Sequence, residues 1–198
     1  MPYEEIEVKF LIDDLPTMRQ RVLAMGATLK TPRTYEDNVL LDTSDHRLMR
    51  QGCLLRLRRD QRSLITYKGP QVDNEHEFKA RPEYEIEVSD LAQAQALLAQ
   101  LGFVPSGRYE KYRETLTYQE AEIVLDEVPV GNFLEIEGPR ERIRTIAEML
   151  GLDFSTRVLA SYGDIVKAVC AAYHLTLCDM TFENFQTMSI DLRRCNLS

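Results

Sequence analysis

Ionised and apolar side chains alternate in the stretch Glu5-Ile6-Glu7-Val8-Lys9-Phe10 near the N-terminus. Alternate side chains of a strand point to opposite faces, so the three ionised residues are predicted to share one face. Two carboxylates two positions apart on a strand lie about 7 Å apart, and at an effective dielectric of about 20 they repel by roughly 2 kcal/mol. A divalent cation bound by both carboxylates would offset that repulsion. The alternative is a surface strand whose outer face is solvated.

Four further stretches carry ionised residues at the same spacing of two, sorted by sign. They are Arg56/Arg58, the acidic triplet Glu83/Glu85/Glu87 that follows Arg81, Lys111/Arg113, and Glu135/Glu137. Pairs of one sign destabilise a plain surface strand, where opposite signs would support one another. Such faces become favourable if they converge on a highly charged ligand. Acidic pairs would then hold metal ions, and basic pairs would hold phosphate oxygens.

The elements that must position these residues are strands joined by short turns, with a few helices. Strand-like stretches are expected at 5–10, 35–42, 53–59, 63–69, 79–88, 109–118, 121–128 and 133–137. Helical spacing of apolar residues ends at Gly26, Gly102 and Gly151, and a fourth helix is expected over 162–175. Pro82 cannot donate to a ladder, so imperfect or edge pairing is expected there. About eight strands with short connections favour an α+β fold with a strongly curved or closed antiparallel sheet.

Composition excludes several classes of protein. The 198-residue chain has a net charge of −8 and a pI near 5.0, which argues against general binding to nucleic acid or to an anionic membrane. No apolar run approaches the ~18 residues of a membrane span, and the N-terminus lacks the layout of a signal peptide, so a cytoplasmic location is expected. The four cysteines form no C-x-x-C pair, so neither a zinc site nor a disulfide framework is indicated.

Taken in order, the charged motifs resemble the CYTH superfamily, also called triphosphate tunnel metalloenzymes, which includes class IV adenylyl cyclases, thiamine triphosphatases and inorganic triphosphatases. Glu5-x-Glu7-x-Lys9 is similar to its signature. The further matches are Val39-Leu40-Leu41-Asp42-Thr43, Leu55-Arg56-Leu57-Arg58, Lys68-Gly69-Pro70, Arg81-x-Glu83-x-Glu85, Lys111-x-Arg113, Val124-Leu125-Asp126 and Glu135-Ile136-Glu137. They extend to about residue 166. A single Glu-x-Glu-x-Lys would be weak evidence, whereas the ordered set is strong.

The resemblance implies an eight-stranded antiparallel closed β-barrel, or tunnel, with helices packed outside. Residues 1–175 would form this domain, and 176–198 would be a C-terminal tail with no assigned role. The interior would bind a triphosphate together with Mg²⁺ or Mn²⁺. The metal ligands implied are Glu5, Glu7, Glu85, Asp126, Glu135 and Glu137. The phosphate-binding residues implied are Lys9, Arg56, Arg58, Lys68, Arg81, Lys111 and Arg113, of which Lys9, Arg56 and Arg58 would be catalytic.

Three basic positions have other interpretations. Arg81 could pair with neighbouring carboxylates instead of phosphate, while Arg59 and Arg62 fall outside the alternation and are expected on the surface. The chain also departs from the family pattern, because Ala160 stands where many members have Lys or Arg before the Ser-Tyr of the last helix. Arg157, one turn earlier, is a candidate to fill that space.

The sequence favours hydrolysis of an inorganic, nucleoside or thiamine triphosphate, because attack by water requires no separately oriented hydroxyl. The alternatives are a class IV adenylyl cyclase that makes cyclic AMP and pyrophosphate from ATP, and a non-catalytic module that binds polyphosphate or nucleotide. The simplest interpretation is a protein whose barrel has a purely structural role. The expected partner is a triphosphate-containing small molecule, without nucleic acid or membrane, and a homodimer is compatible with the sequence.

Overall fold

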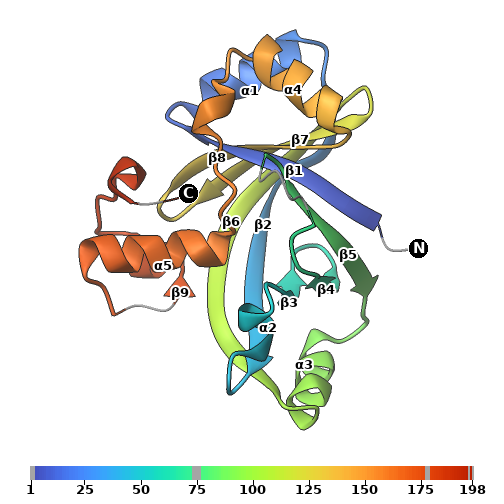
Figure 1. Ribbon diagram of the computed structural model, residues 1–198, viewed down its shortest axis with the longest axis vertical. Helices are drawn as coiled ribbons and strands as arrows, with labels where there is room; N and C mark the ends of the chain where they lie inside the picture. The colour runs from blue at the N-terminus through green and yellow to red at the C-terminus, as the bar shows by residue number, and fades with distance from the viewer. Residues whose placement is uncertain (1–2, 73–76, 177–178, 196, 198) are drawn as a thin grey trace.

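A closed ring of strands dominates the computed structural model, which describes residues 3–72, 77–176, 179–195 and 197 (Figure 1). The strands are β1 (Tyr3–Ile12), β2 (Thr28–Thr43), β3 (Leu54–Arg59), β4 (Ser63–Lys68), β5 (Lys79–Glu87), β6 (Phe103–Tyr118), β7 (Ala121–Val128), β8 (Gly131–Glu137) and β9 (Asp179–Met180). Their order is β2-β3-β4-β5-β1-β8-β7-β6-β9, and pairing of β2 with β6 closes β1 to β8 into the ring. All neighbours within the ring are antiparallel, which confirms the predicted α+β fold with a closed eight-stranded sheet.

The helices lie outside the ring or across its openings. They are α1 (Leu15–Ala24), α2 (Arg47–Arg50), α3 (Leu91–Gln100), α4 (Arg140–Met149), α5 (Tyr162–Tyr173) and α6 (Phe182–Phe185), with 3₁₀ turns η1 (Phe154–Thr156) and η2 (Leu192–Arg194). In Figure 1, α1 and α4 lie side by side above the ring, α3 lies below it, and α5 lies beside β6. The four helices expected from apolar spacing are therefore confirmed. No helix in the described ranges is long and apolar enough to cross a membrane.

The apolar faces of the strands pack outward against the helices. Val8 and Phe10 of β1 are each 1% exposed and belong to one core cluster with Val22 of α1 and Ile143 and Ile146 of α4. Because strand side chains alternate, packing Val8 and Phe10 against helices turns the ionised face of β1 toward the inside of the ring. The ring therefore has an apolar exterior under its helices and a charged interior.

The C-terminal segment packs beside α5 and β6, at the left of the ring in Figure 1, away from α1 and α4. β9 pairs in parallel with β6, and Met180, Phe185 and Leu192 are buried in a second core cluster that also contains Phe133 of β8 and Val169 of α5. These single apolar residues have no periodicity in the sequence. Their burial shows that much of the segment beyond α5 covers apolar surface of the ring and of α5.

One local expectation is met in part and another differs from the structure. Pro82 is not on an edge strand, because it lies opposite Glu4 of β1, but its pairing is imperfect as expected: the β4 ladder stops at Lys68 with Glu83, and the Pro82 carbonyl accepts a hydrogen bond from the Gly69 N–H at 2.8 Å. β2 and β6 are each 16 residues long, well beyond the alternating stretches seen in the sequence, and their pairing has register shifts that bend the ladder. The loop expected at 71–76 lies partly outside the described residues.

Candidate functional site

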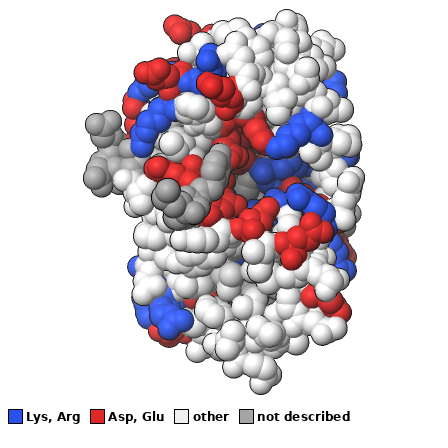
Figure 2. Space-filling model, turned by 90° about the vertical axis from the view of Figure 1, so that its right-hand side faces the viewer, with Lys and Arg blue, Asp and Glu red and all other residues white. Residues whose placement is uncertain are grey.

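The interior of the ring is a cavity of about 800 Å³ to which all eight strands contribute side chains. Figure 2 shows acidic and basic side chains gathered around the hollow on one face of the molecule. Among the described residues, nine carboxylates and ten basic side chains line it. The two signs therefore nearly balance, and each buried charge needs a partner of opposite sign.

The strand register aligns like charges across one end of the cavity. Glu122 of β7 lies opposite Glu137 of β8, Glu137 lies opposite Glu7 of β1, and Glu7 lies opposite Lys79 of β5. Like charges directly opposite one another destabilise a sheet. This row of three glutamates therefore needs cations, of which the protein supplies Lys79 to Glu7 (Nζ to Oε1 2.7 Å) and Lys30 to Glu122.

At the same end of the cavity, the negative charge of the carboxylates exceeds the positive charge of the lysines beside them. Lys68 contacts both Glu5 (2.6 Å) and Glu83 (3.0 Å), so one ammonium serves two carboxylates. Burial, together with the charge of Glu7, raises the pKa of Glu5 to about 7. Burial and the charges of Glu5 and Glu7 likewise raise the pKa of Glu137 to about 7. Burial also disfavours the ionised form of Glu7, but Lys79 and Lys9 outweigh it and hold the pKa of Glu7 well below its usual range.

The residues at this acidic end (Glu5, Glu7 and Glu137) fit a hard divalent cation in donor chemistry and charge. Carboxylate oxygens are the preferred ligands of Mg²⁺ and Mn²⁺, and a cation would relieve the repulsion that raises the pKa values of Glu5 and Glu137. Glu5 and Glu7 are now engaged by lysines. In the described part of the chain, no group of three or more His, Cys, Asp or Glu side chains is already arranged to hold a metal.

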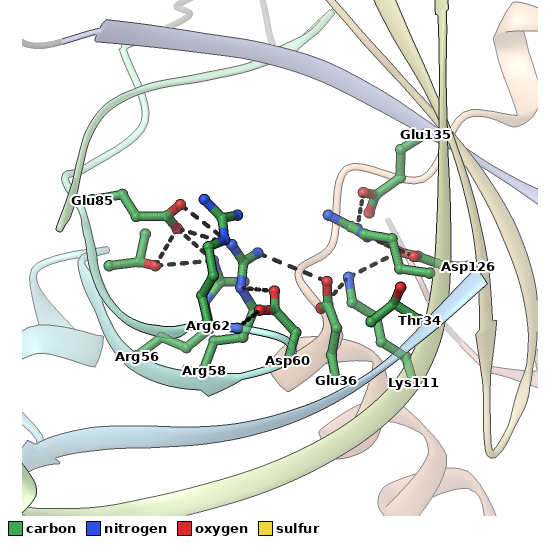
Figure 3. Close-up of polar contacts among 12 residues, drawn as sticks. Thr34, Glu36, Arg56, Arg58, Asp60, Arg62, Glu85, Lys111, Asp126 and Glu135 are labelled. Carbon is green, nitrogen blue, oxygen red and sulfur yellow. Dashed lines mark hydrogen bonds and ion pairs between the residues drawn. The ribbon is translucent and has the colours of Figure 1, made fainter. Parts of the chain in front are cut away.

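The wall formed by β1, β8, β7 and β6 carries a denser network of ion pairs, which begins two positions along β1 and β8 from Glu7 and Glu137 (Figure 3). Arg113 bridges Asp126 (2.5 Å) and Glu135 (2.5 Å), Lys9 contacts Glu135 (2.5 Å), and Lys111 contacts Asp126 (3.0 Å). Although burial opposes ionisation of Glu135, Lys9, Arg113 and Lys111 hold its pKa well below the usual range. Glu135 is thus an ionised carboxylate that fixes the positions of two cations lining the cavity.

Asp126 lies behind the wall and does not line the cavity. Its side chain is fully buried and accepts hydrogen bonds from Lys111, Arg113 and the hydroxyl of Tyr162, the last at 2.6 Å. The Tyr162 ring lies under two of the cavity lysines, Lys9 at 4.7 Å and Lys111 at 4.9 Å from its centroid. The geometry therefore makes Asp126 the anchor of three side chains, and its carboxylate oxygens are directed at these donors.

A second basic cluster lies across the cavity on β3. Arg56 donates to the hydroxyls of Tyr109 (3.2 Å) and Thr66 (3.1 Å), and Arg58 donates to Glu85 (3.2 Å). Glu85 also accepts from Thr66 at 2.7 Å. Figure 3 shows Arg56, Arg58 and Glu85 facing Lys111 across the cavity, with Glu36 between the two sides. This spacing leaves room between two sets of cations.

The structure brings the predicted residues together, with Asp126 set back from the rest. Twelve of them line the cavity: Glu5, Glu7, Lys9, Arg56, Arg58, Lys68, Arg81, Glu85, Lys111, Arg113, Glu135 and Glu137. Arg59 is exposed as expected. Arg62 is also exposed, but it lines the mouth of the cavity.

Several cavity residues were missed by the sequence reasoning. Lys79 could have been found, because it continues the alternation of Arg81 and Glu83 by two positions. Glu36 gave no such signal, because it stands in a polar run, yet it is 4% exposed between Lys111 (3.5 Å) and Arg58 (3.9 Å). Burial opposes ionisation of Glu36, but Lys111, Arg113 and Arg58 lower its pKa to about 2.

The expectation that Arg157 fills the space of the absent basic residue is wrong. Its guanidinium donates to the carbonyls of Glu77 (2.8 Å) and Phe154 (3.0 Å) and stacks over the Phe154 ring, away from the cavity lining. Ala160 packs against the second core cluster. Neither Arg157 nor Ala160 therefore places a basic side chain in the cavity lining.

The site is thus a closed antiparallel ring of eight strands around a cavity of paired charges. The family model of the CYTH domain matches residues 4–157, so the chain belongs to the CYTH family. The resemblance seen in the sequence is thereby confirmed.

Individual relatives agree with this assignment. A Methanocaldococcus jannaschii protein provisionally named an adenylate cyclase is 26% identical over 167 residues, covering 83% of this chain and 89% of the relative. A crystal structure of a Vibrio parahaemolyticus protein with the same provisional name matches with a TM-score of 0.75 and 24% identity, over 85% of this chain and 100% of that one. A Hippeastrum protein, provisionally named an adenylyl cyclase and described as having a dominant triphosphatase activity, matches with a TM-score of 0.60 and 19% identity, over 87% of this chain and 97% of that one. The last two likenesses show the shared fold.

Proposed function

We propose that this protein is a divalent-metal-dependent enzyme that hydrolyses a triphosphate inside the ring of strands. The observation that carries the proposal is the division of charge in the cavity. Glu5, Glu7 and Glu137 form an end with surplus negative charge, while Arg56, Arg58, Lys111 and Arg113 face one another across the remaining space. A triphosphate bound with Mg²⁺ or Mn²⁺ matches both halves.

The basic residues would bind and orient the phosphates. Several of the cavity cations, among them Lys9, Arg58 and Lys111, now contact a carboxylate, so an arriving phosphate oxygen would share or replace that contact without movement of the strand. Rigid cations that are already desolvated stabilise developing negative charge well, because they need no reorganisation during the reaction. In hydrolysis, water oxygen forms a bond to phosphorus, the bond from phosphorus to the bridging oxygen breaks, and the proton of the attacking water passes to solvent or to a cavity carboxylate.

The metal would be held at the acidic end, by Glu5, Glu7 and Glu137 as the residues with surplus charge. When bound, it would supply neutralisation of phosphate charge and polarisation of a phosphate oxygen. Glu85 and Glu135 were also implied as ligands by the resemblance. Their contacts with Arg58 and with Lys9 and Arg113 suit positioning of the phosphate-binding residues instead.

Cyclisation of ATP is the second candidate, supported by the provisional name of the Methanocaldococcus jannaschii relative. The same phosphate clamp would serve both reactions, since they differ in whether water or the ribose 3′-hydroxyl attacks, and at which phosphorus. The dominant triphosphatase activity described for the Hippeastrum protein supports hydrolysis on this fold.

The test is turnover of inorganic triphosphate and of ATP by purified protein with Mg²⁺ or Mn²⁺, with orthophosphate, pyrophosphate and cyclic AMP separated. Hydrolysis predicts orthophosphate, and cyclisation predicts cyclic AMP with equimolar pyrophosphate. Glu7→Gln should abolish either activity. Glu148→Gln, at an exposed position on α4, is the matched control and should retain it. Tight triphosphate binding without any product would indicate a binding module and contradict the proposal.

A further inference from the structure

A second cavity of about 480 Å³ adjoins the charged one. It lies between α2, α5 and the strands β2, β3 and β6, which can be followed in the lower half of Figure 1. Both cavities are lined by Leu54, Arg81, Tyr109, Ser161, Tyr162 and Gly163. The two cavities therefore meet at the start of α5, beside the basic clusters of the charged cavity.

The adjoining cavity has a different chemical character. Side chains of Leu40, Leu41, Leu55 and Val166 line it, as do those of Met49 and two cysteines. A mainly apolar cavity of this size with a few polar groups is typical of a site for a small organic molecule. These apolar side chains would not stabilise a bound triphosphate that carries no organic group.

The polar groups of this cavity favour a neutral organic group over a cationic one. Its two carboxylates are already engaged. Asp42 accepts hydrogen bonds from the backbone N–H groups of Thr43, Leu48 and Met49, and Asp164 contacts Ser161 and Lys167. A positively charged ring would find no uncommitted carboxylate among the described residues that line this cavity.

Asn38 supplies a second, independent observation. It is 0% exposed, and among the described residues neither its amide nitrogen nor its amide oxygen has a hydrogen-bond partner. On β2 it shares a face with Glu36, which lines the charged cavity, and with Leu40, which lines the adjoining one. Asn38 is not itself among the lining residues of either cavity but stands on β2 between residues that are. Because a buried amide without partners is unfavourable, a ligand that presents an adjacent donor and acceptor at this point of β2, as on the edge of a nucleobase, would be favoured.

Gly163 keeps the junction between the cavities open. A Cβ atom at this position would come within 3.3 Å of Leu40 Cδ1 and 3.7 Å of Ser161 Oγ. The backbone there is ordinary helix near the start of α5, so it accepts a larger side chain once the end of the Leu40 side chain shifts by a few tenths of an ångström, and that side chain would project into the junction beside Leu40.

We propose that the adjoining cavity binds the base and sugar of a nucleoside triphosphate whose phosphates lie in the charged cavity. This inference rests on the proposed function and specifies its substrate class. Arg81, which lines both cavities, would lie where the sugar meets the phosphates.

The experiment compares kcat/KM for ATP with kcat/KM for inorganic triphosphate in the wild type, Gly163→Leu and the matched control Gly163→Ala. Closing the junction should lower the ratio of the two values about tenfold or more in Gly163→Leu, and much less in Gly163→Ala. Val166→Phe, which fills the adjoining cavity from one turn further along α5, should lower the same ratio. Equal ratios in all four proteins would overturn the inference while leaving triphosphate hydrolysis intact.

Calorimetric binding of ATP and of inorganic triphosphate separates the two proposals if neither compound is turned over. Weaker binding of ATP to Gly163→Leu, with binding of inorganic triphosphate changed far less, would support the adjoining site although the proposed reaction had failed. ATP affinity that is the same in wild type, Gly163→Leu and Val166→Phe would overturn it. Circular dichroism of each variant checks that the fold is retained.

Discussion

Replacing Glu137 by glutamine should stabilise the metal-free protein, and by an amount that depends on pH. Glu137 lies opposite both Glu7 and Glu122 on neighbouring strands, and burial together with Glu5 and Glu7 raises its pKa to about 7 from an ordinary 4.5. At about 1.4 kcal/mol per tenfold change in proton affinity, this corresponds to about 3 kcal/mol of destabilisation once the carboxyl is ionised in both states. Glutamine keeps the shape and removes the charge.

The direction in which this stabilisation changes with pH follows from the direction of the pKa change. A carboxyl whose pKa is higher in the folded state favours folding fully below about pH 4.5, and this contribution is lost as the pH rises through 7. Urea unfolding in EDTA should therefore show Glu137→Gln and wild type with similar stability near pH 5. The variant should be more stable by up to about 3 kcal/mol at pH 8.

The control and the metal response make the test specific. Glu148→Gln, at an exposed site, should change stability by no more than about 0.5 kcal/mol at either pH. Mg²⁺ or Mn²⁺ should raise the unfolding temperature of the wild type more than that of Glu137→Gln at pH 8, because the variant lacks one of the charges that the cation neutralises. If the wild type were the more stable protein at pH 8 in EDTA, the surplus of negative charge inferred for this end of the cavity would be refuted.

Three further substitutions and one control test the framework around the cavity, each by urea unfolding. Arg113→Ala leaves the fully buried Asp126 without two of its hydrogen bonds and should cost about 3–5 kcal/mol. Tyr162→Phe removes only the hydroxyl that donates to the same carboxylate and should cost about 1–3 kcal/mol; a neutral result would show that this hydrogen bond contributes little. Phe185→Ala, in the second core cluster, should cost about 3–5 kcal/mol. Its control, Met188→Ala at a 37% exposed position, should change stability by about 0.5 kcal/mol at most. Equal effects of the two substitutions would argue against packing of the C-terminal segment.

The fold was largely predictable because alternation along a strand assigns each residue to a face. In β1 the ionised face and the apolar face separate cleanly, and the structure places Lys9 inside the ring and Phe10 under the helices. Short connections between strands then favour antiparallel neighbours. Alternation alone says nothing of which strand pairs with which, so the closure of β2 on β6 depended on the family resemblance.

The candidate site was predictable as a set of residues but less so as a set of contacts. Asp126 shares its motif with cavity residues, yet its role depends on Tyr162, which arrives from the start of α5, 36 residues further along the chain. Arg157 was placed by its distance along the chain, whereas its position is set by the carbonyls of Glu77 and Phe154. Contacts of this kind arise from tertiary packing and leave no local pattern in the sequence.

Pairing of β2 with β6 also bears on how the protein folds. Its residue pairs run from Thr28 with Thr117 to Thr43 with Phe103, so they join segments separated by the whole β3-β4-β5 meander and α3. The intervening chain must lose conformational entropy before such distant contacts can form and stabilise the fold. Proteins with many distant contacts therefore fold slowly. We expect closure of this pair to be a late and slow event in folding. Because the charged cavity exists only after closure, a triphosphate that binds it should slow unfolding and leave the folding rate almost unchanged.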